Sequence, residues 1–197
     1  GLSANYCFND PSANLTGIPS GGTFSGSGIT NNVFSPVQAG VGTHLITYTY
    51  TDVNGCSNLK QQQTIVYGLT QLSFSNLANS YCQNTAPVLL AALPAGGTFY
   101  INNQIQSYLV PNQYPTGIVE IKYVFQNENG CNSSITKNIT ILAPPEVTIT
   151  DPGSPICFID VDINLVGQPA GGIFTGNLTT ESKFNPKQAG IGQHEII

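Results

Sequence analysis

Residues 42–56 read GTHLITYTYTDVNGC, and residues 117–131 read GIVEIKYVFQNENGC. Apolar side chains alternate with mostly polar ones in the second stretch, as in a strand that buries one face. Near its end each stretch contains Asn-Gly, a pair that favours a tight hairpin turn because both residues tolerate positive φ. We therefore expect a β-hairpin in both places. The side chains expected to face the core of the second are Val119, Ile121, Tyr123 and Phe125.

The two stretches are copies of one unit, because they lie 75 residues apart. Residues 1–47 match residues 151–197 at 20 of 47 positions without a gap. The motif GGTF at 21–24 recurs as GGTF at 96–99 and as GGIF at 171–174. A fixed period of this kind indicates a tandem array.

The remainder of each copy also predicts strands. Short runs of β-branched and aromatic residues are separated by Gly, Pro and Asn, and helical periodicity is missing. About seven strands in such a unit fit a small immunoglobulin-like (Ig-like) β-sandwich. In the second copy, the expected strands lie at 69–74, 81–82, 87–93, 98–101, 108–110, 119–126 and 139–142.

The predicted fold class is all-β, with tandem Ig-like β-sandwich repeats of 75 residues arranged as a rod. The expected domains are repeat 1 at 1–68, without its first strand, complete repeat 2 at 69–143, and repeat 3 at 144–197, truncated at its C-terminal end. The joint at 143–146 reads APPE, and two prolines favour a stiff connection. Without an initiator Met or a signal peptide, the chain is expected to be an internal piece of a longer protein.

The five cysteines follow the same period. Cys7, Cys82 and Cys157 occupy one position of the repeat, and Cys56 and Cys131 occupy another, 49 residues further on. One disulfide per repeat is therefore predicted, Cys7–Cys56 and Cys82–Cys131, and the partner of Cys157 is expected outside the chain. Closing such a loop would stabilise a small core by roughly 4 kcal/mol. Paired cysteines also indicate an oxidising, extracellular compartment.

Composition restricts the partners. Charged residues make up 8% of the chain and the net charge is −5, so it lacks the basic surface that nucleic acids and anionic membranes attract. Apolar runs are too short to cross a membrane. The expected partners are neighbouring repeats of the same polypeptide, with an extracellular glycan or surface as a further candidate. Nucleic acid and direct membrane insertion are excluded.

Catalytic chemistry is not predicted. His44 and His194 share a repeat position that holds Val119 in the second copy, which indicates packing rather than acid–base catalysis. A Gly-x-Ser-x-Gly elbow between a strand and a helix is missing. The double glycines lack the following helix or lysine of a phosphate loop, so they predict a turn before a core aromatic residue. We expect no enzyme activity, no catalytic residue and no cofactor.

Among the metals, calcium is the candidate that the sequence suggests most. Asp52 begins Asp-Val-Asn-Gly, which is similar to the start of a calcium loop, and Asp160 and Asp162 offer two carboxylates near a joint between repeats. The Asp52 stretch lacks the later acidic ligand and coincides with the expected hairpin turn. The turn is the favoured interpretation, and no metal site is predicted.

The strings PAGGTF, Phe-x-Pro and AGVGTHLITYTYTDVNGCSN together resemble the Ig-like repeats of very large Bacteroidota surface proteins. The resemblance covers the whole chain, and TYTYTDVNGC is its most specific part. Proteins of this kind include giant adhesins of gliding flavobacteria, typically exported by the type 9 secretion system. The resemblance implies stalk or filament repeats that hold an adhesive tip away from the cell. The second copy departs from the pattern, with YPTG at 114–117 in place of AGVG.

The leading hypothesis is a non-enzymatic extracellular spacer of a bacterial surface adhesin, stiff and clamped by disulfides, with a role in gliding motility or attachment. One alternative is a carbohydrate- or surface-binding module in which Tyr100, Tyr108 and Tyr114 form a stacking patch. Another is an accessory segment of a secreted hydrolase.

Overall fold

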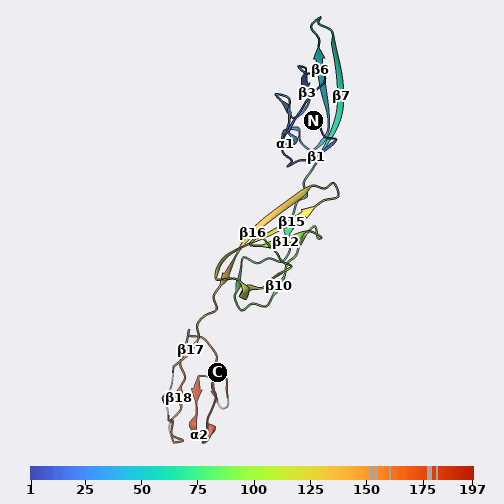
Figure 1. The fold of residues 1–197 in the computed structure, drawn as a ribbon. Helices are drawn as coiled ribbons and strands as arrows, with labels where there is room; N and C mark the ends of the chain where they lie inside the picture. Colours follow the sequence, from blue (N-terminus) through green and yellow to red (C-terminus); the bar gives the residue numbers. More distant parts are fainter. Residues whose placement is uncertain (151–152, 154, 160, 177–178, 181) are drawn as a thin grey trace. The chain divides into compact units, whose positions relative to one another are not determined.

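The computed structural model describes residues 1–150, 153, 155–159, 161–176, 179–180 and 182–197. Within these residues the chain is all-β, with a few helical turns (Figure 1). It forms two compact units, Gly1–Leu142 and Ala143–Ile197. The first unit holds nearly all of predicted repeats 1 and 2, whose boundary remains a prediction. No helix in the described part of the chain is long and apolar enough to cross a membrane.

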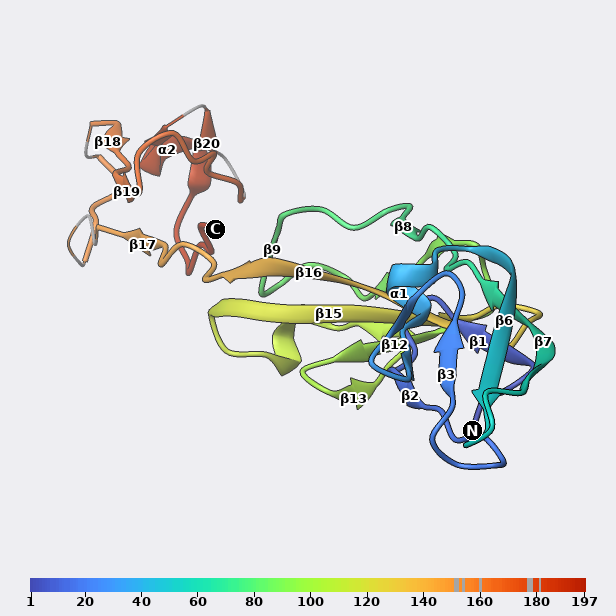
Figure 2. The same cartoon turned by 90° about the horizontal axis from the view of Figure 1, so that it is seen from above.

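The first unit contains two long hairpins, one in each 75-residue copy (Figures 1 and 2). Strand β6 (Gly42–Thr51) pairs antiparallel with β7 (Ser57–Tyr67), and β15 (Gly117–Gln126) pairs with β16 (Asn132–Leu142). Both predicted hairpins are thus confirmed. The second strands are longer than expected, since 139–142 is only the last part of β16. The first part of β7 is polar and exposed, and it extends because it continues the backbone ladder with β6.

The first hairpin belongs to one sheet, and a second sheet accompanies it. The four-stranded sheet has the order β1 (Asn5–Cys7), β7, β6, β3 (Thr23–Ser25), and β1 runs parallel to β7. The three-stranded sheet has the order β2 (Ala13–Asn14), β5 (Val33–Phe34), β4 (Ile29–Thr30). Both sheets supply one core cluster, whose buried members are Tyr6, Leu15, Phe34, Ile46 and Val66.

The second hairpin belongs to a five-stranded sheet with the order β13 (Gln104–Ile105), β12 (Thr98–Ile101), β15, β16, β9 (Ser80–Cys82). Two further pairs accompany it: β10 (Val88–Leu89) with β14 (Tyr108–Leu109), and β11 (Ala92–Leu93) with β8 (Ser73–Phe74). The buried cluster consists of Leu90, Ile101, Leu109, Val119, Ile121, Ile139 and Ile141. Of the four predicted core side chains of β15, Val119, Ile121 and Tyr123 are buried and Phe125 is partly buried.

The predicted continuous strand at 87–93 is wrong, because the segment divides into β10 and β11 and these pair with different partners. The side chain of Asn76 stabilises the interruption between β10 and β11. Its Nδ2 donates to the Leu89 carbonyl at 2.7 Å, and its Oδ1 accepts from the Ala91 N–H at 3.1 Å. The backbone therefore leaves one strand partner and takes another within a few residues.

The second unit is built from short strands. β17 (Thr148–Ile149) pairs with β19 (Gly167–Gln168), and a three-stranded sheet has the order β18 (Ile163–Asn164), β21 (Lys183–Phe184), β20 (Thr179–Thr180). Leu165 and Phe184 are buried in it.

Single helical turns, which we did not predict, follow three of these strands: α1 (Pro36–Ala39), η1 (Pro111–Gln113) and α2 (Pro186–Ala189). They lie at one position of the 75-residue period. Ser35 and Asn185 cap α1 and α2, each accepting a bond from the backbone N–H three residues later. A capping residue before Pro is a recognised start signal for a helix, so Ser-Pro and Asn-Pro could have indicated both turns.

Candidate functional site: the disulfide junction of the first unit

A disulfide joins Cys7 to Cys131 across 124 residues of sequence, with the two Cα atoms 5.5 Å apart. The predicted pairs Cys7–Cys56 and Cys82–Cys131 are therefore wrong. Cys56 and Cys82 instead carry free, exposed thiols. The prediction of an oxidised pair holds for one bond, but that bond joins the first 75-residue copy to the second.

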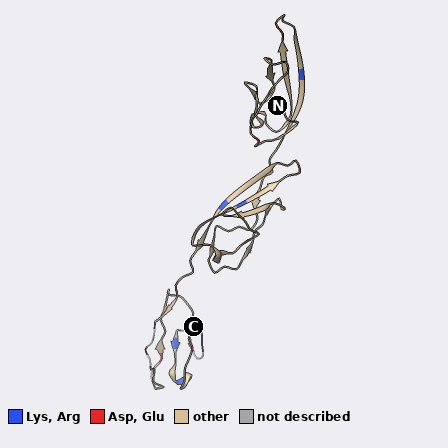
Figure 3. Cartoon of the chain, in the orientation of Figure 1, with Lys and Arg blue, Asp and Glu red and all other residues tan. Residues whose placement is uncertain are grey.

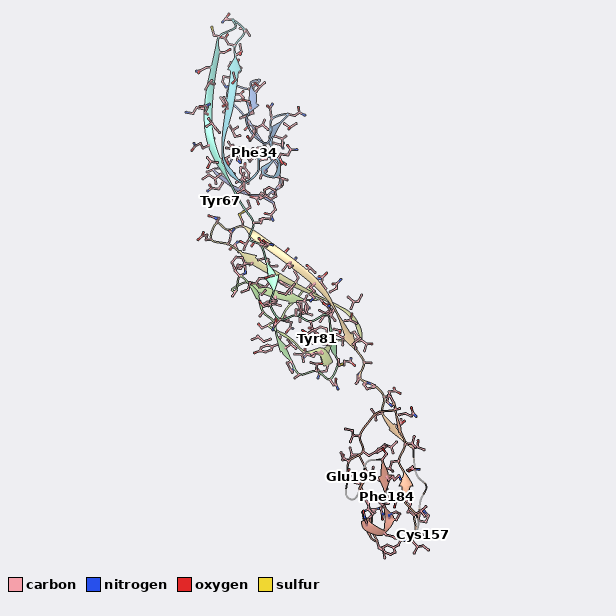
Figure 4. The ribbon with its side chains drawn as sticks, turned by 180° about the vertical axis from the view of Figure 1, so that it is seen from behind. Phe34, Tyr67, Tyr81, Cys157, Phe184 and Glu195 are labelled. Atoms are coloured by element: carbon pink, nitrogen blue, oxygen red, sulfur yellow. A yellow bond between two sulfur atoms is a disulfide. The ribbon has the colours of Figure 1, made fainter. Side chains whose placement is uncertain are left out.

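Strand length explains why a copy does not close on itself. Cys7 pairs with Tyr67, the last residue of β7, whereas Cys56 directly precedes Ser57, the first residue (Tyr67 is labelled in Figure 4). Ten residues of extended strand span about 33 Å. A disulfide needs Cα atoms within about 7 Å, so these two cysteines cannot bond while β7 is intact.

The second copy repeats this arrangement. Cys82 pairs with Leu142 at the end of β16, and Cys131 directly precedes Asn132 at its start. The strand again holds the two cysteines of one copy apart. The observed separation of 124 residues equals the within-copy spacing of 49 plus one period of 75, so Cys7 reaches the second cysteine of the following copy.

The loop between β15 and β16 fixes the backbone of Cys131 through hydrogen bonds. Asn127 Oδ1 accepts from the N–H groups of Asn129 at 3.1 Å and Cys131 at 2.9 Å, which makes an Asx turn. Asn127 Nδ2 donates to the Gly68 carbonyl at 3.3 Å, so the turn also contacts the chain that connects the copies. Cys131 itself is fully buried.

The two residues that follow Cys131 make two more hydrogen bonds. Asn9 Nδ2 donates to the Asn132 carbonyl at 3.2 Å, and the Thr70 N–H donates to Ser133 Oγ at 2.9 Å. Ser133 is buried. The disulfide is therefore the covalent part of a junction that side chains on both copies support.

Asp52, the first calcium candidate, occupies the turn position that Asn127 has in the second copy. Its Oδ1 accepts from the N–H groups of Asn54 at 2.9 Å and Cys56 at 2.8 Å. Because a neutral amide makes the same pair of bonds, the geometry of this loop requires no cation. This arrangement is the hairpin turn that the sequence favoured.

The other acidic candidates lie elsewhere. Asp162 Oδ1 accepts from Asn185 Nδ2 at 2.7 Å, beside the start of α2, and Asp160 lies outside the described residues. The residues that the structure describes contain no cluster of three or more His, Cys, Asp or Glu side chains that could hold a metal ion. Charged residues are few and dispersed along the chain (Figure 3).

Both histidines make a local structural contact. His44 Nε2 donates to the Gly40 carbonyl at 2.8 Å, and His194 Nε2 donates to the Gly190 carbonyl at 3.0 Å. Each of these glycines caps the C-terminus of a helical turn, α1 or α2. The histidines thus tie each helical turn to the chain that follows it.

The three candidate tyrosines come from separate elements. Tyr100 lies on β12 and is partly buried, whereas Tyr108 on β14 is half exposed. Tyr114 follows η1 and packs against the core cluster, and this burial raises the pKa of its phenol above the ordinary value. No ring contact is seen among these three, all of which are described residues. The stacking patch stays a prediction.

Comparison with known proteins gives only distant similarity. No family model and no curated protein sequence matches the chain. One similar solved structure is a Ca2+-stabilized, ice-binding adhesin of an Antarctic bacterium, with 12% identity over 88% of this chain and 57% of that chain and a TM-score of 0.30.

Another is SGBP-B of the Bacteroides ovatus mixed-linkage glucan utilization locus, in complex with a mixed-linkage heptasaccharide. It has 14% identity over 92% of this chain and 53% of that chain, with a TM-score of 0.28. The chain thus spans little more than half the length of either structure. At these TM-scores the likeness carries no argument about function.

Proposed function

We propose that this chain is a non-enzymatic, extracellular spacer, in which tandem Ig-like sandwiches form part of the stalk of a bacterial surface adhesin. The sequence resemblance suggests the gliding, type 9-secreted Bacteroidota kind. The observation that carries the proposal is the Cys7–Cys131 bond, because it joins consecutive copies instead of closing one. Such a bond suits a protein whose task is to keep neighbouring domains connected.

The side chains with catalytic or metal-binding potential make structural hydrogen bonds, which supports this proposal. His44 bonds a carbonyl at the end of a helical turn, and Asp52 caps a hairpin turn. The features that recur in step with the period are the turn glycines, the long hairpins and the junction cysteines. The repeated part of the molecule is therefore scaffold.

The junction defines a path for tension. Force applied to the N-terminus reaches Cys7, crosses the disulfide to Cys131, and continues along β16 to Leu142. The segment between the two cysteines is bypassed, so it cannot lengthen while the bond is intact. A stalk built in this way transmits load with little gain in length.

Force–extension measurements on single molecules, pulled from both termini, test this mechanism. The bond closes a loop across 124 residues of sequence, and this loop cannot extend while the bond is intact. Complete unfolding in reductant should therefore release about 430 Å more chain than unfolding in the absence of reductant. Cys7→Ser, pulled without reductant, should give the longer trace as well. Identical traces with and without reductant would defeat the proposed mechanism.

A further inference from the structure

We propose that Asn129, in the loop between β15 and β16, is a deamidation site and that the Cys7–Cys131 bond controls its reaction. The loop resists deamidation while the bond is intact, and opening of the bond permits it. The proposal goes beyond the spacer role, because it assigns a covalent modification and the contact that governs it. It does not require the chain to be part of a stalk.

Two Asn-Gly pairs occur in the chain, Asn54-Gly55 and Asn129-Gly130, and each lies in the loop of a long hairpin. All four residues are exposed to solvent. Glycine has no Cβ, so its backbone nitrogen can approach the preceding side chain with little hindrance. Both pairs therefore have the composition and the exposure that favour attack of the glycine nitrogen on the asparagine amide.

The reaction needs no reagent besides water. The Gly130 nitrogen attacks Cγ of Asn129 and loses its proton, and the side-chain amide leaves as ammonia, so that a five-membered succinimide ring forms. Water then opens the ring at either carbonyl. The product is aspartate or iso-aspartate, and iso-aspartate carries one additional methylene group in the backbone. The net change is the gain of one water molecule and the loss of one ammonia molecule.

The folded loop holds the nitrogen that would attack. The Gly130 N–H donates to the Asn127 carbonyl at 2.9 Å, and the Asn129 N–H donates to Asn127 Oδ1 at 3.1 Å. The Gly130 nitrogen must leave this hydrogen bond and lose its proton before the ring can close. The reaction therefore proceeds from a locally opened loop, and its rate follows the free energy of that opening.

The two loops differ in how the cysteine that follows each Asn-Gly pair is anchored. In the first loop the Gly55 N–H makes the equivalent bond, to the Asp52 carbonyl at 3.1 Å, but Cys56 carries a free thiol. In the second loop Cys131 is fully buried and bonded to Cys7. Opening of the second loop has to displace a covalent anchor, so we expect it to open less often than the first.

The test follows both asparagines in the full chain, with Cys56→Ser, Cys82→Ser and Cys157→Ser to prevent thiol exchange. The protein is aged in warm, mildly alkaline buffer with or without reductant, then reduced and digested with trypsin. Asn54 lies in peptide 1–60 and Asn129 in peptide 123–137, and mass spectrometry measures the acid formed at each position. In the oxidised protein Asn129 should react about tenfold more slowly than Asn54, and reductant should remove this difference by accelerating Asn129 alone.

Two variants complete the design. Cys7→Ser should accelerate Asn129 in the absence of reductant, and Asn129→Gln should remove the acid that forms in peptide 123–137 on reduction. Equal rates at Asn54 and Asn129 in the oxidised protein would overturn the proposal. Equal acceleration of both asparagines on reduction would also overturn it, because this would show unfolding of the whole unit rather than opening of one loop. The force–extension test of the spacer role does not depend on any of these outcomes.

Discussion

The second glycine of the GGTF motif brings the backbone against a core tyrosine. The Gly97 N–H donates to the Tyr123 hydroxyl at 2.7 Å, and that hydroxyl donates to the Pro94 carbonyl at 2.6 Å. A Cβ on Gly97 would lie 2.6 Å from the Tyr123 ring and would also meet the Val124 carbonyl. The sequence predicts a turn before a core aromatic residue here. It could not show that the turn rests on a tyrosine 26 residues away.

Gly97→Ala should therefore lower the free energy of unfolding by roughly 1–3 kcal/mol, because the added methyl group forces the turn off Tyr123. Gly172→Ala is the matched control, since it has the same place in the GGIF motif and a Cβ there would meet nothing within 4 Å. Urea unfolding followed by tyrosine fluorescence measures both. Equal losses in the two variants would show that the close approach to Tyr123 is not what requires glycine.

At the scale of elements, the end of each long hairpin depends on an Asx turn. Asp52→Asn should leave the melting temperature unchanged, because Asn127 makes the same two bonds in the second copy. Asn127→Ala should lower the free energy of unfolding by about 1 kcal/mol, because a hydrogen-bonded turn side chain is lost.

Thermal melts should also be the same with EGTA and with calcium. A calcium-dependent rise that disappears in Asp52→Asn would instead establish a cation site in this loop.

Sequence patterns predicted an element where its form depends on the segment itself, and missed it where its form depends on a pairing partner. The period-two alternation in 119–126 was sufficient for β15, since it reflects burial of one face of a single strand. The division of 87–93 depends on Asn76, a side chain that lies outside this segment. The extension of β16 to Asn132 depends on the ladder with β15. Neither the Asn76 hydrogen bonds nor the pairing with β15 can be recognised from the residue pattern of the segment concerned.

At the scale of the whole molecule, the regular cysteine spacing has two solutions. A bond inside a copy spans 49 residues and a bond to the next copy spans 124, and both recur every 75 residues. Only the strand decides between them, because β7 and β16 place the two cysteines of one copy at opposite ends. On the chain-entropy model, closing the larger loop stabilises the first unit by about 5 kcal/mol. The regular spacing of the cysteines could therefore be read from the sequence, but the disulfide partner of each cysteine could not.

Peptide mapping without reduction tests the junction most directly. The chain contains five Lys and no Arg, and trypsin cleavage after Lys60, Lys122 and Lys137 separates Cys7, Cys82 and Cys131 into different peptides. The Cys7–Cys131 bond predicts that peptide 1–60 is joined to peptide 123–137, and that reduction releases the two. A digest in which 61–122 is joined to 123–137, with a bond inside 1–60, would contradict a junction between copies.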